Sequence, residues 1–579
     1  MNGKRRVYVF VSLLLAGLLS LTSSSVPLNA QSAPGRLAFA AFRNGQWDLY
    51  SVSEMGGDLR QITNDPYEDR TPAYSPDGSR LAYASRRDRN WDVYVLDLRS
   101  GEETRITTNP HYDGAPSWSP DGERLAFESF RTGDLDVWTV DAQGGNQVNL
   151  TADSSSGDFD PAWAPQGETI AFASWRNGNK DLFLVDTVAG SVEQLTDSSE
   201  AEELPAWSPD GKQLAFVRNW LGDREVYLAD VSDMTKIGQF TWFRRDDSPV
   251  WAPDGSRLAF VTQRYDGEQL GWLRVASGDE LPTYVTGVDR IVGRIDWHGG
   301  PVDAGVPLDT LDNQESSPLY AEEVSPSQSP DGEPWDLLQL ADVDLPTPDM
   351  TPYLSDRVDD SYYALRQRIL DEVGYDYLGE LSEAYRPVGF YSDVSEYASW
   401  HKSGRALDTL FDYHNGEGQV MELVRDDRGG ETYWRVMLRC LVQDGSCGLP
   451  LTAAAWNYSR TARTELAPDQ GGVEKGEIAA YYVDVTSLMG EYGWTRISSW
   501  DSEEFSWTWH FKGFEYWHFQ KTDGLLWYQA MQEVHAPAKL SQLFTYEDMR
   551  QRGDPPVLIA LKGVPLPAET RSWWRMLQP

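Results

Sequence analysis

The chain has 579 residues, of which 40% are hydrophobic and 12% aromatic, and it carries a formal net charge of −40. This composition excludes a disordered chain, and this length exceeds what one hydrophobic core holds, so two or more globular domains are expected. The strongly acidic balance argues against nucleic acid or an anionic membrane surface as a partner. We interpret it as a well-hydrated surface.

The first 30 residues have the pattern of an export signal. The basic stretch Lys4 to Arg6 is followed by the apolar run Val7 to Leu21, and Leu28 to Ala30 offers a cleavage site before Gln31. No cysteine follows the apolar run, which argues against a lipoprotein anchor; an uncleaved anchor stays open. Since no other segment is long and apolar enough to span a bilayer, we expect a protein that is secreted or held in the periplasm or cell envelope.

A repeat follows the signal. A phrase containing a Pro-Asp-Gly turn recurs at steps of 44 or 45 residues. Each copy continues with an apolar triplet such as Leu125-Ala126-Phe127, a strand such as Asp136 to Val140 and a short ending such as Leu195-Thr196. Four short strands per unit of this length predict the blades of a β-propeller. The aromatic residues that mark the five copies are Tyr74, Trp118, Trp163, Trp207 and Trp251.

Two incomplete units at the ends predict a sixth blade. Arg36 to Phe39 and Asp48 to Tyr50 lack the strand that should precede them, and Ile295 to Trp297 lacks the strands that should follow. Joined together, these fragments make one closing blade, so the fold expected over residues 31–300 is an all-β six-bladed propeller.

The S-P-D-G-x-x-L-A-F phrases at 75–83, 119–127 and 208–216 resemble those of TolB-type propellers. The third unit departs from the pattern, with Pro165-Gln166-Gly167 in place of Pro-Asp-Gly. We interpret the repeated residues as structural, because a fold does not imply a function. Loops at one rim could bind a protein, a peptide or a glycan.

Residues 301–334 differ in composition, with Pro, Ser, Asp, Glu and Gly dominant, as in Ser325 to Pro330. This pattern predicts a flexible acidic linker. The remaining residues, 335–579, are expected to form a second domain of the α+β class. The elements predicted there are a helix from Asp360 or Ser361 to about Val373, hairpin strands at 419–424 and 432–440, an exposed loop at 468–476, a helix at 478–492, and a strand at 507–511.

Two short motifs in the predicted second domain contain residue types that bind metal ions. The first, S-x-H-x-x-G-x-A-x-D, contains His401 and Asp408; the second, E-x-W-H-F, contains Glu515 and His518. Two imidazoles and one carboxylate suit a catalytic zinc ion with one open coordination position. The remaining carboxylate can act as general base. Because residues three apart on a straight strand face opposite sides, the backbone must bend between Glu515 and His518, and Gly404 supplies a flexible point in the first motif.

Together and in this order, the motifs resemble those of zinc peptidases that act on D-alanyl-D-alanine, the D,D-carboxypeptidases and dipeptidases of peptidoglycan metabolism and vancomycin resistance. The resemblance covers about 350–550 and implies that His401, Asp408 and His518 bind Zn²⁺, that Glu515 is the base, and that peptidoglycan stem peptides are the substrates. It also suggests that Arg386 binds the substrate carboxylate. Yet Pro387 replaces the serine that follows this arginine in the family, so an ordinary ion pair is the alternative for Arg386.

The two cysteines, Cys440 and Cys447, flank an Asp444-Gly445 turn signal. In an oxidising compartment this arrangement predicts a cross-hairpin disulfide, and the absence of C-x-x-C spacing disfavours metal binding by these residues. The histidines outside the motifs are interpreted as structural or loop residues; they are His111, His298, His414, His510 and His535.

Two hypotheses of different classes follow. The first is a secreted zinc metallopeptidase of the carboxypeptidase type, with a propeller that binds a partner or targets the enzyme to the cell wall. The second is a non-catalytic cell-envelope binding protein that acts through its propeller, with the second domain retained for ligand recognition. Zinc content and hydrolysis of muropeptides discriminate between them.

Overall fold

A computed structural model describes residues 34–567, with gaps at 244, 265–266, 277–280, 286–289, 301–305, 308–318, 325–336, 347–351, 391–397, 417, 429–430, 463–471 and 500–513. The predicted export signal, most of the predicted linker, residues 468–471 of the predicted loop, the predicted strand at 507–511 and His510 lie outside the described residues. Within the described part of the chain, no helix is long and apolar enough to cross a bilayer.

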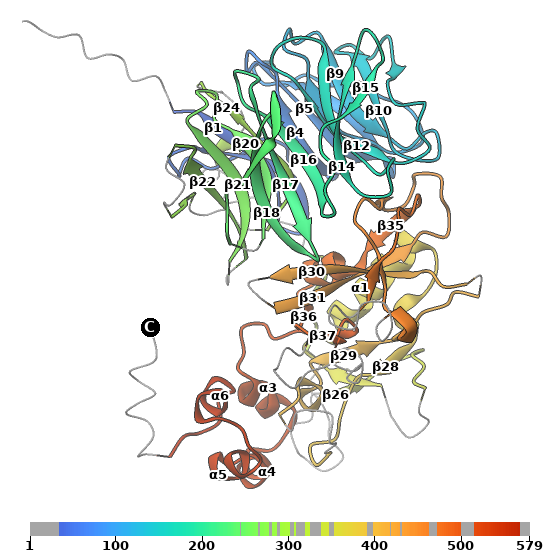
Figure 1. Ribbon diagram of the computed structural model, residues 1–579. Helices are drawn as coiled ribbons and strands as arrows, with labels where there is room; N and C mark the ends of the chain where they lie inside the picture. Colours follow the sequence, from blue (N-terminus) through green and yellow to red (C-terminus); the bar gives the residue numbers. More distant parts are fainter. Residues whose placement is uncertain are drawn as a thin grey trace, which may run out of the picture. The chain divides into compact units, whose positions relative to one another are not determined.

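The N-terminal region consists of six antiparallel sheets, drawn from blue to green in Figure 1. The closing sheet has the order β24-β1-β2-β3-β25, so the last strands of the repeat pair with the first. This arrangement confirms the propeller-like all-β fold predicted from the repeat. The closing strands are β1 (Arg36–Arg43), β2 (Gln46–Ser53), β3 (Arg60–Gln61), β24 (Ile291–His298) and β25 (Val306–Pro307).

Each of the other five sheets has four strands. In all five sheets, strands that follow one another in the chain pair with one another. Their strands are β4 (Glu68–Tyr74), β5 (Arg80–Arg87), β6 (Asn90–Asp97), β7 (Glu103–Arg105); β8 (Asp113–Trp118), β9 (Arg124–Ser129), β10 (Asp136–Asp141), β11 (Val148–Asn149); β12 (Asp158–Trp163), β13 (Thr169–Ser174), β14 (Asp181–Asp186), β15 (Val192–Gln194); β16 (Ala201–Trp207), β17 (Gln213–Trp220), β18 (Asp223–Asp230), β19 (Asp233–Gln239); and β20 (Asp246–Trp251), β21 (Arg257–Arg264), β22 (Gly267–Arg274), β23 (Thr283–Val285).

The repeated tryptophans connect neighbouring blades. The indole N–H of Trp251 donates to the carbonyl of Ala206, 3.1 Å away and 45 positions earlier in the chain. Trp207 makes the same bond to Ala162 at 3.0 Å. Because the acceptor lies in the preceding blade, each bond satisfies a backbone carbonyl and fixes the packing of one sheet on the next. Trp163 instead donates to Gly167 in its own blade, at 3.3 Å.

The threonine of each Leu-Thr ending also has a repeated role. The hydroxyl of Thr151 accepts the backbone N–H of Val137 at 3.0 Å and lies 3.2 Å from the carboxylate of Asp136. Thr107 makes the equivalent contacts with Val93 and Asp92. The hydroxyl therefore satisfies a strand-end amide and a buried acid at once, which explains why the repeat ends in threonine.

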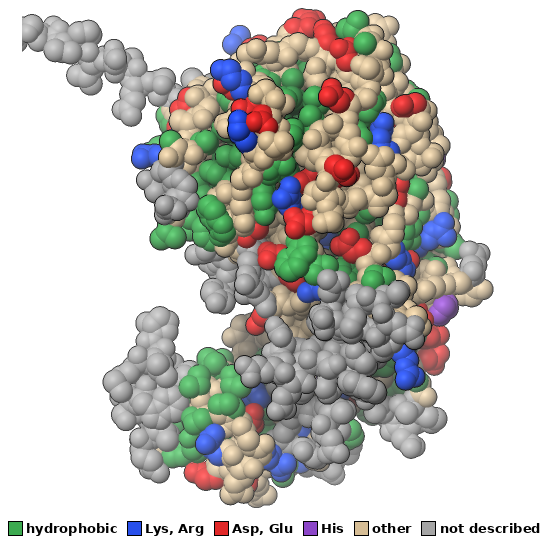
Figure 2. All heavy atoms as spheres, in the orientation of Figure 1, with side chains coloured by type: hydrophobic (Ala, Val, Ile, Leu, Met, Phe, Trp, Pro, Cys, Tyr) green, Lys and Arg blue, Asp and Glu red, His purple; other side chains and the backbone are tan. Residues whose placement is uncertain are grey.

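On the face drawn in Figure 2, acidic and basic side chains of the described residues are interspersed over the propeller. The negative charge of the chain is therefore not gathered into one acidic surface on this face. This distribution agrees with our interpretation of the charge as general hydration.

The second domain mixes helices and sheets (Figure 1). Its main sheets have the orders β28-β29-β37-β36 and β30-β31-β35-β32, and β26-β27 and β33-β34 are short pairs. The strands are β26 (Leu337–Gln339), β27 (Tyr353–Ser355), β28 (Leu381–Glu383), β29 (Ala406–Thr409), β30 (Met421–Arg428), β31 (Glu431–Arg439), β32 (Leu449–Pro450), β33 (Trp456–Asn457), β34 (Val473–Glu474), β35 (Tyr481–Asp484), β36 (Thr495–Arg496) and β37 (His518–Gln520). The helices are α1 (Asp359–Val373), η2 (Tyr377–Gly379), η3 (Trp400–Ser403), α2 (Val485–Glu491), α3 (Trp527–Val534), α4 (Pro537–Leu543), α5 (Tyr546–Gln551) and α6 (Pro556–Leu561).

Helix α1 ends at Val373, as predicted, but it begins earlier than predicted, at Asp359: the sequence predicts Asp360 or Ser361 as the cap of the helix, whereas Val358 occupies the N-cap position. The helix predicted over 478–492 is wrong in its first half. Residues Tyr481–Asp484 form strand β35, because this aromatic and β-branched segment pairs with β31. The carboxylate of Asp484 then accepts the N–H of Ser487 at 3.1 Å, and this cap begins helix α2 at Val485.

Cys440 and Cys447 are joined by a disulfide, with their Cα atoms 6.1 Å apart. The local fold differs from the predicted cross-hairpin arrangement. The strands on either side, β31 and β32, do not pair with each other, since both pair with β35. The disulfide therefore closes a loop between two strands that share one neighbour.

Candidate metal centre

The first motif reaches its site through a tight turn at Gly404. His401 lies on η3, and Gly404 ends this short helix with a φ of +68°. A side chain at position 404 would also meet the backbone nitrogen of Ser355 at 2.8 Å. Only glycine meets both conditions without strain. The chain then continues into β29, which carries Asp408.

Strand pairing brings the second motif to the first. β29 pairs with β37, and in this register Asp408 lies opposite His518. Directly opposed residues of an antiparallel pair have neighbouring side chains. The sheet therefore places the carboxylate of one motif beside the imidazole of the other, and the turn at Gly404 adds His401.

The three candidate ligand atoms form a nearly equilateral triangle. His401 Nε2 lies 3.1 Å from Asp408 Oδ1 and 3.2 Å from His518 Nδ1, and His518 Nδ1 lies 2.8 Å from Asp408 Oδ1. Ligands about 2.0 Å from a tetrahedral zinc ion are about 3.3 Å apart. The donor atoms present thus fit a zinc ion, and their one-sided arrangement leaves a fourth position open.

Hydrogen bonds from the outer ring nitrogens orient both histidines. His401 Nδ1 lies 2.6 Å from the carbonyl oxygen of Ala384, so this nitrogen carries the proton and Nε2 presents its lone pair to the site. His518 Nε2 lies 3.5 Å from Gln520 Oε1, a longer contact that favours the same polarity. Both imidazoles are buried, with exposed fractions of 1% and 8%.

Electrostatics also favour a cation at this place. Burial raises the pKa of Asp408, but the charges and hydrogen bonds of the two histidines outweigh it and hold that pKa far below its usual range. Burial lowers the pKa of His401, and the Asp408 carboxylate overcomes this effect and raises it. The carboxylate therefore remains ionised, and the positive charge that this buried anion needs can come from a protonated imidazole or from a metal ion.

Glu515 lies three residues before His518, at a sharp backbone bend. Its φ is +54°, and its carbonyl accepts the N–H of His518 at 3.2 Å. This is the bend that the three-residue spacing requires if both side chains are to serve one site. A positive φ at a glutamate is uncommon and is typical of functional positions.

Arg386 lies beside the metal centre and forms an ion pair. Its guanidinium makes two hydrogen bonds to Glu383, of which Nη2 to Oε2 measures 2.6 Å, and Nη1 reaches Ser399 Oγ at 3.5 Å. Burial lowers the pKa of Arg386, but Glu383 first, and then the charges of Asp408 and Glu515, raise it above its usual value. The charges of carboxylates from both motifs thus act on Arg386. The ion pair of Arg386 with Glu383 is largely buried and does not lie on the surface.

Sequence reasoning missed three supporting groups: Glu383, the carbonyl of Ala384, and Gln520. A weak signal existed for Gln520, which lies two residues after His518 on the same strand and hence on the same face. A backbone carbonyl has no sequence signature. Glu383 is recognisable as the partner of Arg386 only once the chain is folded.

The other described histidines behave as ordinary structural residues. His535 is buried, and its Nε2 lies 2.8 Å from the carbonyl oxygen of Lys402. His414 is half exposed and lies 3.3 Å from Asp412.

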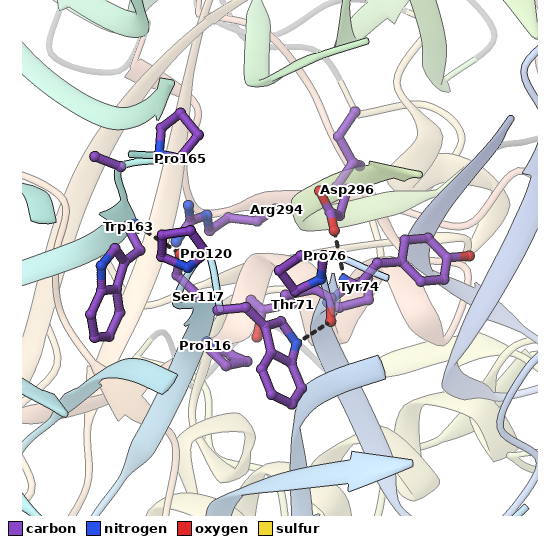
Figure 3. Close-up of a pocket in the computed structure, with 15 residues that line it drawn as sticks. Thr71, Tyr74, Pro76, Pro116, Ser117, Pro120, Trp163, Pro165, Arg294 and Asp296 are labelled. Atoms are coloured by element: carbon purple, nitrogen blue, oxygen red, sulfur yellow. Dashed lines mark hydrogen bonds between the residues drawn. The ribbon is translucent and has the colours of Figure 1, made fainter. Parts of the chain in front are cut away.

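The propeller has a separate pocket of about 330 Å³, formed by the repeated Pro-rich turns (Figure 3). Arg294 and Asp296 add charge to this lining, which exposes both polar and apolar atoms. Arg294 Nη1 donates to the carbonyl of Pro161 at 2.8 Å, and Asp296 accepts the N–H of Tyr74 at 2.6 Å. The lining residues are Thr71, Pro72, Ala73, Tyr74, Pro76, Pro116, Ser117, Trp118, Pro120, Trp163, Ala164, Pro165, Arg294, Ile295 and Asp296.

Comparison with known proteins identifies the repeat region. Residues 26–158 and 141–287 match the family described as the TolB beta propeller domain. No curated protein matches the sequence. A solved structure of TolB from Acinetobacter baumannii is 23% identical, covers 45% of this chain and 66% of its own, and has a TM-score of 0.42.

Two further structures match the same share of the chain. Oligogalacturonate lyase in complex with manganese is 18% identical over 44% of this chain and 74% of its own, with a TM-score of 0.33. A puromycin-hydrolyzing peptidase of Mycobacterium tuberculosis is 14% identical over 44% of this chain and 45% of its own, also at 0.33. The chain spans less than two thirds of the length of the Acinetobacter and Mycobacterium proteins. With the family match and the six sheets together, the N-terminal region of this chain is a TolB-type β-propeller.

Proposed function

We propose that the protein is a zinc-dependent peptidase of the D,D-carboxypeptidase type. The observation that carries this proposal is the triangle of His401 Nε2, Asp408 Oδ1 and His518 Nδ1, with separations of 2.8 to 3.2 Å. The resemblance of the two motifs to the family's motifs supports the reaction type.

In this proposal, His401, Asp408 and His518 hold the ion. When bound, zinc polarises a carbonyl and lowers the pKa of water towards about 7. Glu515 takes a proton from the attacking water and returns it to the leaving amine. Its backbone bend lies three residues before His518, and the charge of its carboxylate acts on Arg386, as the charge of Asp408 does.

Arg386 is the proposed binding group for the terminal carboxylate of the substrate. Glu383 holds its Nε and Nη2 atoms, whereas the hydrogen bond of Nη1 within the described part of the chain is the 3.5 Å contact with Ser399. Nη1 is therefore the donor most easily offered to a ligand. The pair with Glu383 would keep the guanidinium oriented towards the substrate.

The proposed substrates are peptidoglycan stem peptides that end in D-alanyl-D-alanine, a choice that rests on the sequence resemblance. The proposed location is outside the cytoplasm, which rests on the signal predicted over residues 1–30. The propeller would bind a protein, a peptide or a glycan and so keep the enzyme at the cell wall.

The test is hydrolysis of a D-Ala-D-Ala-terminated pentapeptide by the full chain loaded with zinc. Glu515→Gln should reduce kcat by about 10³-fold or more while the zinc content stays unchanged. Glu547→Gln, at an exposed position of α5, is the matched control and should keep wild-type activity. Full activity in Glu515→Gln would refute the assigned base.

A second function, binding without catalysis, is favoured by the propeller pocket in Figure 3. A pocket that combines aromatic and proline side chains with one arginine and one aspartate suits a peptide segment. If zinc binds but no D-alanyl peptide is cleaved, this function becomes the main one. In that case Arg294→Ala should weaken the capture of cell-wall components by the full chain.

A further inference from the structure

A second group of possible metal ligands lies at the start of helix α1, apart from the histidine site. It contains Asp359, Asp360 and Glu322, the last from a short described segment, 319–324, that precedes the second domain. One carboxylate oxygen of each residue lies within 4.8 Å of the others. Helix starts commonly carry acidic residues, so proximity alone does not indicate a ligand.

The burial and the hydrogen bonding of Asp359 are a second observation, independent of the proximity of the three acids. This residue is only 7% exposed, and its Oδ1 has no hydrogen-bond partner among the described residues. Its side chain nevertheless faces the oxygens of Glu322 and Asp360. A buried carboxylate that has one oxygen without a hydrogen-bond partner, and that is grouped with two further carboxylates, is costly unless a positive charge neutralises the group.

Charges around the group leave this cost uncompensated. Asp356 adds a fourth carboxylate to the field at Asp359, and Asp523 adds one to the field at Glu322. The Lys521 ammonium also acts on Glu322, but it is bonded to Asp523 at 2.7 Å and to the hydroxyl of Tyr320 at 2.8 Å.

The ionisation of the two acids reflects this imbalance. Burial, and then the neighbouring Asp360 and Asp356, raise the pKa of Asp359 to about 6. Burial raises the pKa of Glu322 to about 7, with Asp360 and Asp359 adding to the rise against the opposing charge of Lys521.

We propose that Glu322, Asp359 and Asp360 bind a calcium ion that fastens segment 319–324 to the start of α1. All three ligands are carboxylates, which hard cations prefer. Three protein carboxylates favour Ca²⁺ over Mg²⁺, because Mg²⁺ is usually held by one or two carboxylates together with phosphate groups of a substrate. Water would fill the remaining positions around the ion.

The contacts of the segment show what the ion would reinforce. The N–H of Glu323 donates to Asp360 Oδ2 at 2.6 Å, and the ring of Tyr320 stacks on Tyr492 with centroids 5.9 Å apart. A calcium ion bridging Glu322 to α1 adds a stronger connection at the same place. It would hold the end of the chain segment that follows the propeller against the second domain.

The test uses the full chain, saturated with zinc, stripped of calcium and titrated with CaCl₂ by calorimetry. One calcium ion per chain is expected, with a rise in Tm that depends on its concentration. Tb³⁺ offers a second readout, because Trp494 donates its indole N–H to Ser361 at 2.8 Å and so lies near enough to sensitise the ion. His518→Ala should leave calcium binding unchanged, which separates this site from the zinc site.

Glu322→Gln should weaken calcium binding at least tenfold. Because this residue lies outside the helix, the variant keeps the fold of α1, whereas Asp359→Asn alters a buried position. Glu323→Gln, one residue away and exposed, is the matched control and should bind as the wild type does. The proposal is overturned if the wild type shows no calcium-dependent heat or Tm shift, or if the two glutamine variants bind calcium equally.

Discussion

His401 Nε2 and His518 Nδ1 lie 3.2 Å apart, although 117 positions separate them in the chain. The pairing of β29 with β37 produces this proximity, because it sets Asp408 opposite His518. Two unprotonated imidazole nitrogens and a carboxylate oxygen repel one another at such distances unless a cation lies between them. The fold of this sheet therefore brings the three candidate ligand atoms together.

Gln520 is predicted to support metal affinity without touching the metal. Its Oε1 faces His518 Nε2 and favours the ring orientation that directs Nδ1 to the site. Gln520→Leu should weaken zinc affinity by about 10-fold, the lower end of what such supporting contacts contribute. Competition with a zinc chelator measures this. Thr522→Val, at a position two residues further on, is the control; equal affinity in Gln520→Leu and wild type would show that the 3.5 Å contact has no role.

The buried Asp69 of the first repeat predicts a pH-dependent stability. Burial, and then the charge of Asp65, raise its pKa to about 8. In the unfolded chain this pKa is about 3.9, so between pH 4 and 8 the unfolded state loses a proton that the folded state keeps. Stability should fall over this window, by up to about 5 kcal/mol, because each pKa unit contributes about 1.4 kcal/mol.

Asp69→Asn should flatten that slope, as measured by urea unfolding at several pH values. Asp77→Asn is the control, because the pKa of the exposed Asp77 is lowered to about 2 by hydrogen bonds from Ser75 and Ser79. Its ionisation lies outside the window. A slope between pH 5 and 8 that is identical in wild type and Asp69→Asn would contradict the assignment.

Trp251 is predicted to stabilise the packing of two blades. It is 5% exposed, and its indole bonds the carbonyl of Ala206. Trp251→Phe removes this donor and part of the ring, and should cost about 2–3 kcal/mol in the free energy of unfolding. Trp220→Phe, at a position that is 58% exposed, should change it by less than about 0.5 kcal/mol. Equal effects of the two substitutions would exclude a blade-connecting role.

The Cys440–Cys447 disulfide closes a short loop, with a sequence separation of 7. Loop entropy then predicts a contribution of about 2.5 kcal/mol. The double variant Cys440→Ser, Cys447→Ser should unfold at a correspondingly lower urea concentration, and a reducing agent should shift the wild type but not the variant. A wild-type protein insensitive to reduction would argue against a stabilising disulfide.

The parts of the fold that the sequence predicts are those with a strong period or a local signature. The 44-residue step identifies the blades because similar turns and similar tryptophan and threonine contacts recur in most of them. The boundary between β35 and α2 was missed because Tyr481 to Val483 suits either a helix or a strand until β31 lies beside it. The secondary structure of such a segment depends on its pairing with a distant strand, and a local sequence pattern does not contain that information.

The candidate site also contains some residues that the sequence reveals and others that only the folded chain reveals. Its ligands are recognisable because zinc chemistry restricts the residue types, and Gly404 because the turn excludes other residues. The Glu383–Arg386 pair and the carbonyl of Ala384 depend on folded geometry alone. The carboxylates of Glu322 and Asp359 are 37 positions apart with no shared motif, so only the structure brings them together.

Elemental analysis of the purified full chain, beside the His518→Ala variant, tests the proposed metal centre most directly. We expect about one zinc ion per wild-type chain and loss of that zinc in the variant. A wild-type protein that holds no zinc even after supplementation, or zinc retained in full by His518→Ala, would contradict it.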